Sequence, residues 1–482
     1  MINFSCNNEK NTPNIILIMA EDISTDLEVY GTEGLQTPNL NKMSENGELF
    51  KRFYATSPIC SPNRSALMTG VHQVKLNSHN HRSNRNYVLP DPYKPITYWL
   101  RKNGYTCLLG AGNELSTPSS KYDVNFKVKP TGEWDGKEKF GLFDESRIFN
   151  YQDQPFFSQI SLSSTHRSGR WDEVRSKSLD PVNVDEISLP PYMADNEIIK
   201  LDWATHLDQI EYIDQQIGQI FQILKEKKLL ENSIVIFIAE NGRCNIRGKG
   251  YLFEPGIKIP LIIHNPFNNK KGKINNKLVD ATDLSATILD YAGISIPDYM
   301  TGSSFINNSF DRNYVFSARD QWDEIFDKSR SITTNQWKYI KNYKPELPYD
   351  IGQAYLEFNR PPVHIMRKLK NEGSLTESQL HFFKSKKPDE ELYDLKNDPH
   401  ELINLAKNSE YENKILEFRK QLSELEIKYS PISDENEPII AAAPKVLDWM
   451  KKNKKNLYNR MVNGERMIYS KIKSEYDKSF KN

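Results

Sequence analysis

A cysteine and an arginine four residues apart, Cys60 and Arg64, are a pair whose types and spacing could do chemistry. Ser61 is a suitable N-cap and Pro62 suits the first position of a helix, so we expect a short helix that ends at Gly70. Cys60 would then lie just before a helix N-terminus, where free N–H groups and the helix dipole favour negative charge. Arg64 could reach the same place with its planar guanidinium. The pattern predicts a thiol with a lowered pKa or a cradle for an anion; the alternative is a buried structural cysteine beside a surface arginine.

Two apolar runs, residues 14–20 and 233–239, are each followed at once by side chains that carry oxygen. Both runs have the composition of strands buried on both faces. The oxygen-bearing residues after them are Glu21 and Asp22 and, in the second case, Glu240 and Asn241. In doubly wound sheets, ligands bind outside the carboxyl ends of the strands. Three carboxylates and one amide oxygen meeting there would suit Ca²⁺ or Mg²⁺, although a single acidic pair after a strand usually only solvates a loop.

The elements that must position these residues alternate between strands and helices. Strands are expected over 14–20, 104–110, 155–162, 233–239 and 259–264, and helices over 40–47, 94–103 and 198–226. This alternation predicts an α/β fold with a large, mostly parallel mixed sheet sandwiched by helices. After residue 330, alternating polarity around a turn at Asn335 predicts an antiparallel hairpin.

The composition limits the classes of partner and the number of domains. The chain has 482 residues, too many for one simple domain, and its 64 basic residues balance 64 acidic ones, so no overall charge favours a nucleic acid as partner. No apolar run is long enough for a transmembrane segment. Four cysteines, of which one is the candidate nucleophile, do not indicate a disulfide framework. The expected division is an N-terminal leader remnant or disordered tail over 1–12, a catalytic domain over 13–330, a C-terminal subdomain over 331–430 and a basic helical extension over 431–482.

The segment from Cys60 to Arg64, Cys-Ser-Pro-Asn-Arg, continued as far as Gly70, resembles the signature of the type I sulfatases of the alkaline phosphatase superfamily. The resemblance implies that a formylglycine-generating maturation enzyme oxidises Cys60 to formylglycine (3-oxoalanine), whose hydrated aldehyde is the nucleophile. It also implies that Ca²⁺, or Mg²⁺ in its place, is held by the four oxygen-bearing residues after the two strands and by residue 60. The family usually has aspartate where this chain has Glu21 and Glu240, so each carboxylate reaches one methylene further here.

Other segments match the family's site residue by residue. Lys249 resembles the second catalytic lysine, and His166 matches the histidine that holds the sulfate or protonates the leaving oxygen. Lys121 resembles the first catalytic lysine, although many sulfatases have Lys-x-His there and this chain has Asp123. The segments that resemble substrate-binding parts of the heparan N-sulfatase-like and algal-polysaccharide branches contribute His79, His81, Arg82, Arg319 and Asp320. The alternative is an ordinary surface residue for His166, a metal site for His79 and His81, and a surface ion pair for Arg319 and Asp320.

The end of the chain also resembles this family. Residues 391–405 are similar to the strand-to-helix part of its small C-terminal subdomain, which implies a smaller C-terminal α+β subdomain with an antiparallel sheet. A helix is expected to follow over 410–428. Residues 441–482 carry 11 Lys and Arg against 4 Asp and Glu, which we interpret as a solvated helical extension rather than a polyanion-binding tail.

The resemblance implies hydrolysis of sulfate esters, or sulfamates, on a sulfated polysaccharide or oligosaccharide. Arg64, Lys121 and Lys249 would stabilise charge on the sulfuryl oxygens, and His166 would protonate the leaving group. One alternative is a phosphonate monoester or phosphodiester hydrolase of the same superfamily. Another is a catalytically weak homologue that binds sulfated glycans.

The N-terminus bears on location. Cys6, followed by polar residues, resembles the end of a bacterial lipoprotein signal. A lipid anchor at Cys6 and a periplasmic or cell-surface location are therefore expected, and a disordered N-terminus in the cytoplasm is the alternative.

Overall fold

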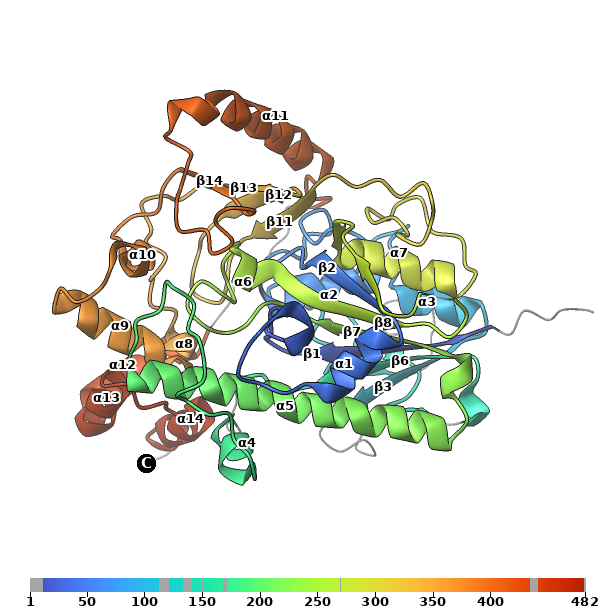
Figure 1. Cartoon of the computed structure of the whole chain (residues 1–482), viewed down its shortest axis with the longest axis horizontal. Coiled ribbons are helices and arrows are strands. Elements are labelled where there is room, and N and C mark those ends of the chain that lie inside the picture. Colours follow the sequence, from blue (N-terminus) through green and yellow to red (C-terminus); the bar gives the residue numbers. More distant parts are fainter. Residues whose placement is uncertain are drawn as a thin grey trace, which may run out of the picture.

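The core of the molecule is a mixed sheet near the centre of Figure 1, with strand order β10-β2-β8-β7-β1-β6-β3 and β9 beside β2. The computed structural model describes residues 12–111, 121–132, 141–149, 151–167, 171–268, 270–433 and 441–480. The strands are β1 (Asn14–Ala20), β2 (Glu48–Tyr54), β3 (Thr106–Ala111), β6 (Phe156–Leu162), β7 (Ser233–Ala239), β8 (Lys258–His264), β9 (Lys273–Asn275) and β10 (Val279–Asp280). Strand β8 runs antiparallel to both of its neighbours, β2 and β7, whereas β1 is parallel to β6 and β7.

Helices cover both sides of this sheet (Figure 1). On one side α1 (Pro38–Glu45) packs against the long helix α5 (Glu197–Glu226), and on the other α2 (Cys60–Thr69) packs with α3 (Ile96–Lys102) and α7 (Ala281–Tyr291). The prediction of an α/β fold with a sandwiched, mostly parallel mixed sheet is confirmed. The sequence analysis did not predict β2, whose apolar residues are interrupted by Lys51 and Arg52, and it also did not predict α7.

A second sheet, which is antiparallel, has the strand order β11-β12-β13-β14 and lies beside helix α11 (Figure 1). Its strands are β11 (Val315–Arg319), β12 (Ser329–Thr333), β13 (Trp337–Asn342) and β14 (Glu390–Asp394), and α11 spans Glu412–Lys428. The predicted hairpin and the predicted antiparallel sheet are confirmed. The sheet begins before the boundary expected at residue 330, and the other domain boundaries stay predictions.

The remaining elements surround these two sheets. They are α4 (Trp171–Lys177), α6 (Glu254–Ile257), α8 (Ala354–Asn359), α9 (Pro361–Asn371), α10 (Glu377–Leu380), α12 (Ala443–Asn453), α13 (Lys455–Val462), α14 (Tyr469–Lys478) and the pair β4 (Lys129–Thr131) and β5 (Gly141–Phe143). Helices α12 to α14 pack around Phe358 of α8 through an apolar cluster. The candidate lipid-anchor residue, Cys6, lies outside the described residues.

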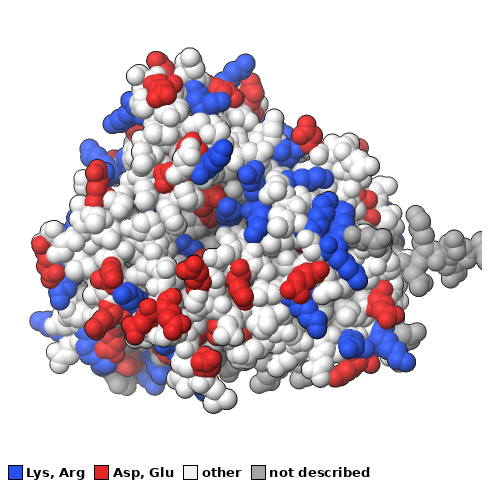
Figure 2. Space-filling view, viewed as in Figure 1, with Lys and Arg blue, Asp and Glu red and all other residues white. Residues whose placement is uncertain are grey.

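The face of the molecule drawn in Figure 2 carries charges of both signs. Figure 2 shows basic and acidic side chains interspersed over one face of the molecule, in keeping with the equal numbers of each in the sequence. No helix in the described part of the chain combines the length and the apolar composition that crossing a bilayer requires.

A buried ion cluster joins the antiparallel sheet to α6. The Nζ atom of Lys338, on β13, lies 2.7 Å from Oε1 of Glu254 and 3.1 Å from Oε1 of Glu401, and the side chain of Lys338 is 0% exposed. Burial alone would raise the pKa of Glu254, but Lys338 and Lys258 lower it to about 2. The lysine therefore lies between two carboxylates, of which Glu401 is fully buried and Glu254 is 11% exposed.

Replacing Lys338 by methionine is expected to lower the free energy of unfolding by about 3–5 kcal/mol, because it leaves the fully buried carboxylate of Glu401 without its cation. Urea denaturation measures the change. The matched control is Lys341→Met on the same strand, which is half-buried and is expected to change stability by less than about 0.5 kcal/mol. Equal stability of the two variants would contradict the prediction.

Candidate functional site

Helix α2 carries Cys60 in its first turn. The helix begins at Cys60 with Ile59 as the N-cap, because the carbonyl of Ile59 accepts the first intrahelical hydrogen bond. The expectation that Ser61 caps the helix is wrong, since its Oγ instead accepts the backbone N–H of Arg82 at 3.1 Å. The predicted end at Gly70 is confirmed: this residue has a left-handed conformation with φ of +66°.

The surroundings of Cys60 favour the neutral thiol. Its side chain is buried, and burial raises the pKa of the thiol to about 12; Lys249 acts against this shift and Glu240 adds to it. The prediction of a lowered thiol pKa is therefore wrong for the unmodified cysteine, because desolvation outweighs the helix N-terminus and the nearby cations. The other part of that prediction, an anion-binding site at the start of the helix, is not affected by this shift in pKa.

Strands β1 and β7 deliver the oxygen-bearing side chains to one edge of the central sheet. They are parallel neighbours with Ala20 opposite Ala239, so the residues that follow each strand lie level with each other. These side chains are all buried: Glu21, Asp22, Glu240 and Asn241. The structure thus brings four oxygen-bearing residues together from segments more than two hundred residues apart.

Lys249 reaches this edge through an ion pair with Asp22. Its Nζ lies 2.5 Å from Oδ1 of Asp22, and both side chains are buried. Burial opposes the charge of Lys249, but Asp22 raises the pKa of the lysine well above its ordinary value. Gly250 holds the loop in place, because its N–H donates to the carbonyl of Pro58 at 2.9 Å and a Cβ there would lie 2.1 Å from the ring of Trp322.

Arg64 is held by Glu240, the acidic residue that follows β7. Its Nε is hydrogen-bonded to Oε2 of Glu240, and its Nη1 and Nη2 are buried without a partner among the described residues. Burial lowers the pKa of Arg64, but Glu240 and Glu21 together raise it above its ordinary value. Asn63 of the same helix donates its Nδ2 to the carbonyl of Glu240 at 2.6 Å and so ties α2 to β7. Buried guanidinium N–H groups that lack an acceptor are suited to an anion.

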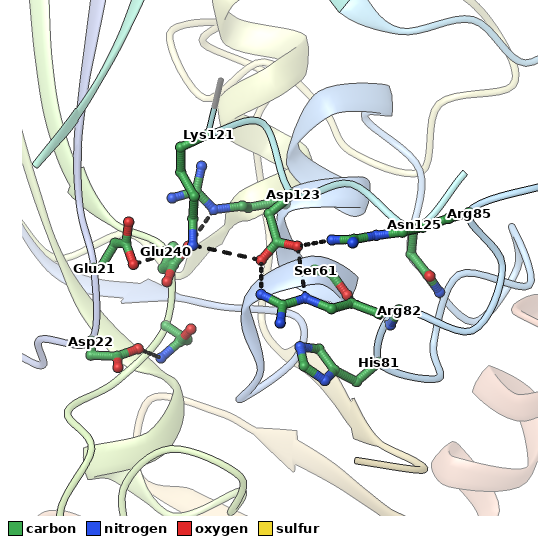
Figure 3. Close-up of polar contacts among 12 residues, drawn as sticks. Glu21, Asp22, Ser61, His81, Arg82, Arg85, Lys121, Asp123, Asn125 and Glu240 are labelled. Atoms are coloured by element: carbon green, nitrogen blue, oxygen red, sulfur yellow. Dashed lines mark hydrogen bonds and ion pairs between the residues drawn. The ribbon is translucent and has the colours of Figure 1, made fainter. Parts of the chain in front are cut away.

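Lys121 forms the third such pair at this edge. Its Nζ lies 3.3 Å from Oε2 of Glu21, and its side chain is 30% exposed. Burial opposes its charge, and Glu21 and Glu240 raise the pKa of the lysine. Figure 3 shows Lys121 between Glu21 and Asp123, with Glu240 beside them. At this edge of the sheet, Arg64 and Lys249 are therefore each paired with one carboxylate, and Lys121 lies near two.

The remaining predicted catalytic residue, His166, follows β6. Because β6 is the parallel neighbour of β1, His166 lies beyond the same edge of the sheet. Burial raises the pKa of Asp22, but Lys249 first and His166 second hold it below its ordinary value. His166 therefore lies within electrostatic reach of the acidic edge.

The segment with His79, His81 and Arg82 contacts the segment that follows β11. The N–H of His81 donates to the carbonyl of Gln321 at 2.9 Å, and its Nδ1 lies 2.8 Å from Oδ1 of Asp323. Burial lowers the pKa of both histidines. The two segments that resemble substrate-binding parts thus lie side by side.

Two further residues of the sequence prediction lie in other ion pairs. Arg319 is hydrogen-bonded to Asp327, and Asp320 lies 2.9 Å from Arg330, with all four side chains buried. The structure does not place either in contact with Cys60, and a role in binding substrate stays a prediction for both.

Oxygen ligands for a divalent cation are present but are paired with cations of the protein. Among the described residues, no group of three or more His, Cys, Asp or Glu side chains is arranged to hold a metal ion as it stands. Three buried oxygens at this edge nevertheless lack a hydrogen-bond donor: Oε1 of Glu21, Oε1 of Glu240 and Oδ1 of Asn241. A donor set made of oxygen alone, with unsatisfied acceptors, fits a hard divalent cation.

Comparison with known proteins shows which family this chain belongs to. Residues 13–294 match the model of the sulfatase family, and residues 242–353 match that of the N-sulphoglucosamine sulphohydrolase C-terminal region. The chain belongs to the sulfatase family. The type I sulfatase resemblance seen in the sequence is confirmed, and the family generally uses a formylglycine residue and a divalent metal ion.

This sulfatase is similar to proteins from distant organisms. It is 30% identical over 455 residues to an ulvan-active sulfatase of Formosa agariphila, covering 85% of this chain and 74% of the relative. It is 23% identical over 458 residues to the N-sulphoglucosamine sulphohydrolase of Homo sapiens, covering 85% and 89%. Among solved structures, a phosphonate monoester hydrolase of Agrobacterium radiobacter has a TM-score of 0.60 at 17% identity, covering 86% of this chain and 96% of that one. The last likeness establishes the fold alone.

Sequence reasoning missed several partners in the sulfatase site. Nothing in the sequence indicates that Asp323 meets His81, because the two are 242 residues apart. Arg85 was also missed, although its Arg-x-x-Arg spacing from Arg82 is visible in the sequence. Asp123 was noted only as a departure from the family's pattern, whereas the structure places it at the centre of a cluster of cations.

Proposed function

We propose that this sulfatase hydrolyses sulfate esters on a sulfated polysaccharide or oligosaccharide, with residue 60 as the nucleophile. The observation that supports this most is the set of three cations paired with carboxylates at the edge of the sheet near the start of α2: Arg64, Lys121 and Lys249. A tetrahedral sulfuryl group with several anionic oxygens is the kind of group that such a set stabilises. The carbohydrate part of the proposal comes from the substrates named for its relatives.

Each residue has a role that follows from its place. Oxidised to formylglycine and hydrated, residue 60 would supply an oxygen nucleophile and a second hydroxyl through which sulfate is expelled. Arg64 would present its two buried Nη groups to the sulfuryl oxygens, and Lys249 and Lys121 would add charge from either side. His166, beyond the end of β6, is the proposed acid for the leaving oxygen.

The cation in this proposal is Ca²⁺, with Mg²⁺ as the alternative. Glu21, Asp22, Glu240, Asn241 and residue 60 would hold it, and its charge would act on the sulfate oxygens. The longer carboxylates of Glu21 and Glu240 reach cations of the protein here, so a metal ion would compete with Lys121 and Arg64 for them.

Adding Ca²⁺ is expected to raise the melting temperature of the protein, by the equivalent of about 2.7 kcal/mol when the ion is at a hundred times its Kd. Glu240→Gln should remove most of this increase, because the amide keeps the shape of the side chain but not its charge. Calorimetry measures both. The control is Glu417→Gln on α11, an exposed residue paired with Lys414, which should keep the full increase. An unchanged increase in Glu240→Gln would count against the site.

The test of the proposed function is release of sulfate from defined sulfated saccharides by the matured protein, compared with hydrolysis of a phosphate diester. Faster turnover of a sulfated saccharide is the expected result. Faster turnover of the diester would favour the phosphodiesterase alternative, and no turnover of either would favour a glycan-binding homologue.

A periplasmic or cell-surface location, with a lipid on Cys6, is part of the proposal, because polymeric saccharides are met outside the cytoplasm. Peptide mapping in the native host that found an unmodified Met1 would remove the anchor.

A further inference from the structure

Asp123 lies at the centre of a cluster of cations, near Ser61 at the start of α2 (Figure 3). Arg82 donates Nε and Nη2 to the two oxygens of this carboxylate at 3.0 and 2.9 Å. Arg85 donates Nη2 to Oδ1 of the same group, and Nζ of Lys121 lies 3.8 Å from Oδ2. One carboxylate therefore faces three cations. Because Lys121 also lies 3.3 Å from Glu21, the two arginines and Asp123 leave one positive charge without a counter-charge.

The exposure of these side chains is uneven. Asp123 is only 4% exposed, whereas Arg82 is 41% and Arg85 46% exposed. Among the described residues, Nη1 of Arg82 and both Nε and Nη1 of Arg85 have no hydrogen-bond partner. The buried carboxylate thus holds two guanidinium groups in place while each keeps donors that face solvent.

The cluster lies next to the start of α2. The backbone N–H of Arg82 donates to Oγ of Ser61 at 3.1 Å, one residue after Cys60. The charges of Asp123 and Arg82 both act on the thiol of Cys60, which shows that the cluster is within electrostatic range of the nucleophile. Arg64 and Lys249 are buried, whereas Arg82 and Arg85 are exposed. We call the two exposed arginines the rim of the site.

The backbone at this rim is strained. Arg82 has φ of +57° and Asp123 has φ of +43°, in the left-handed region that residues with a Cβ seldom adopt. Such conformations persist where surrounding contacts enforce them, and they are concentrated at ligand sites. The contacts that enforce them here are the hydrogen bonds between the two side chains and the bond from Arg82 to Ser61.

We propose that Arg82 and Arg85 bind a second anionic group of the saccharide, next to the sulfate that is removed, and that Asp123 is the residue that positions them. The proposal rests on the proposed function, because the first sulfate is assigned to Arg64, Lys121 and Lys249. Two exposed guanidinium groups, each with N–H donors left over from the contact with Asp123, suit a carboxylate or a second sulfate, and both chemistries are tested below. Where many sulfatases have a histidine after the first lysine, this chain has an aspartate that brings in two arginines instead.

The experiment measures equilibrium binding to the full chain with unmodified Cys60, so that no turnover disturbs it. The ligands are three sulfated disaccharides that differ at one position, which carries a free carboxylate, a second sulfate or a neutral hydroxymethyl group. Calorimetric titration is expected to give a Kd about tenfold lower for at least one of the two doubly anionic ligands than for the neutral one. The better of the two identifies the source of the anion.

Arg85→Gln is expected to reduce this ratio of Kd values to about twofold or less, and Arg85→Lys to keep an intermediate ratio, since it retains charge without the fork. The control is Arg460→Gln, which removes another exposed arginine, paired with Glu465, and should leave the ratio unchanged. A ratio near one in the wild type, or a full ratio in Arg85→Gln, would overturn the proposal.

These results separate the two proposals. Matured protein that releases no sulfate, but whose unmodified form keeps the binding ratio, would refute sulfate hydrolysis and leave the rim site standing. Sulfate release together with a ratio near one would refute the rim site alone.

Discussion

Replacing Cys60 by serine is expected to abolish repeated release of sulfate from a sulfated saccharide, with kcat lower by about 10⁴-fold or more. Serine has one hydroxyl and is not a substrate for oxidation to formylglycine by the route proposed for cysteine. It could at most attack sulfur once, and the resulting serine sulfate has no second hydroxyl through which to expel the sulfate. Mass spectrometry of the protein after incubation with substrate would then detect one added sulfuryl group or none.

The matched control for this variant is Cys107→Ser. Cys107 is also fully buried, in β3, and lies outside the proposed site. Its replacement should reduce stability through the buried hydroxyl while leaving kcat within about twofold of the wild type. Full multiple-turnover activity in Cys60→Ser would falsify the role of formylglycine.

Replacing Lys249 by methionine is expected to lower kcat/KM for a sulfated saccharide by about 10²–10³-fold, because it removes one fixed positive charge aimed at the sulfuryl oxygens. Methionine fills a similar volume, so the loop held by Gly250 should keep its path. Among the residues that the structure describes, the same change leaves Asp22 with Asn241 as its remaining hydrogen-bond donor, at 3.0 Å. Steady-state kinetics with the matured protein measures the loss.

Two further variants show whether the loss of activity comes from the charge of Lys249. Lys473→Met removes an exposed lysine paired with Asp477 on α14 and should not change kcat/KM. Lys249→Arg keeps the charge but not the shape and should recover part of the activity. A Lys249→Met enzyme as active as the wild type would show that the lysine serves only to neutralise Asp22.

The fold could be predicted where a local pattern decides the structure. The runs that became β1 and β7 are buried on both faces, and the long helix α5 has a steady apolar period, so each was visible in the sequence. The first turn of α2 was misplaced because a good N-cap residue, Ser61, is used by Arg82 instead. Strand β2 was missed because its charged residues, Lys51 and Arg52, interrupt the apolar pattern.

The site could be predicted only as far as its motif and its strand ends. Cys60, Arg64 and the two oxygen-bearing pairs are local features, and resemblance to the family added the lysines. Which cation meets which carboxylate depends on distances between segments far apart in the chain, and no spacing in the sequence contains that information. The pairing of Glu240 with Arg64 and the placement of Asp123 between Arg82 and Arg85 are results of the fold.

Because β1 and β7 lie level with each other, the length of the acidic side chain after either strand can change while the path of the backbone stays the same. Each strand is fixed by its neighbours as far as Ala20 and Ala239, so exchanging glutamate for aspartate at the next position moves an oxygen without moving the main chain. A single-residue insertion in either strand would instead turn every later side chain to the opposite face. Evolution within this family can therefore adjust the acids one methylene at a time, while the length of these two strands stays constrained.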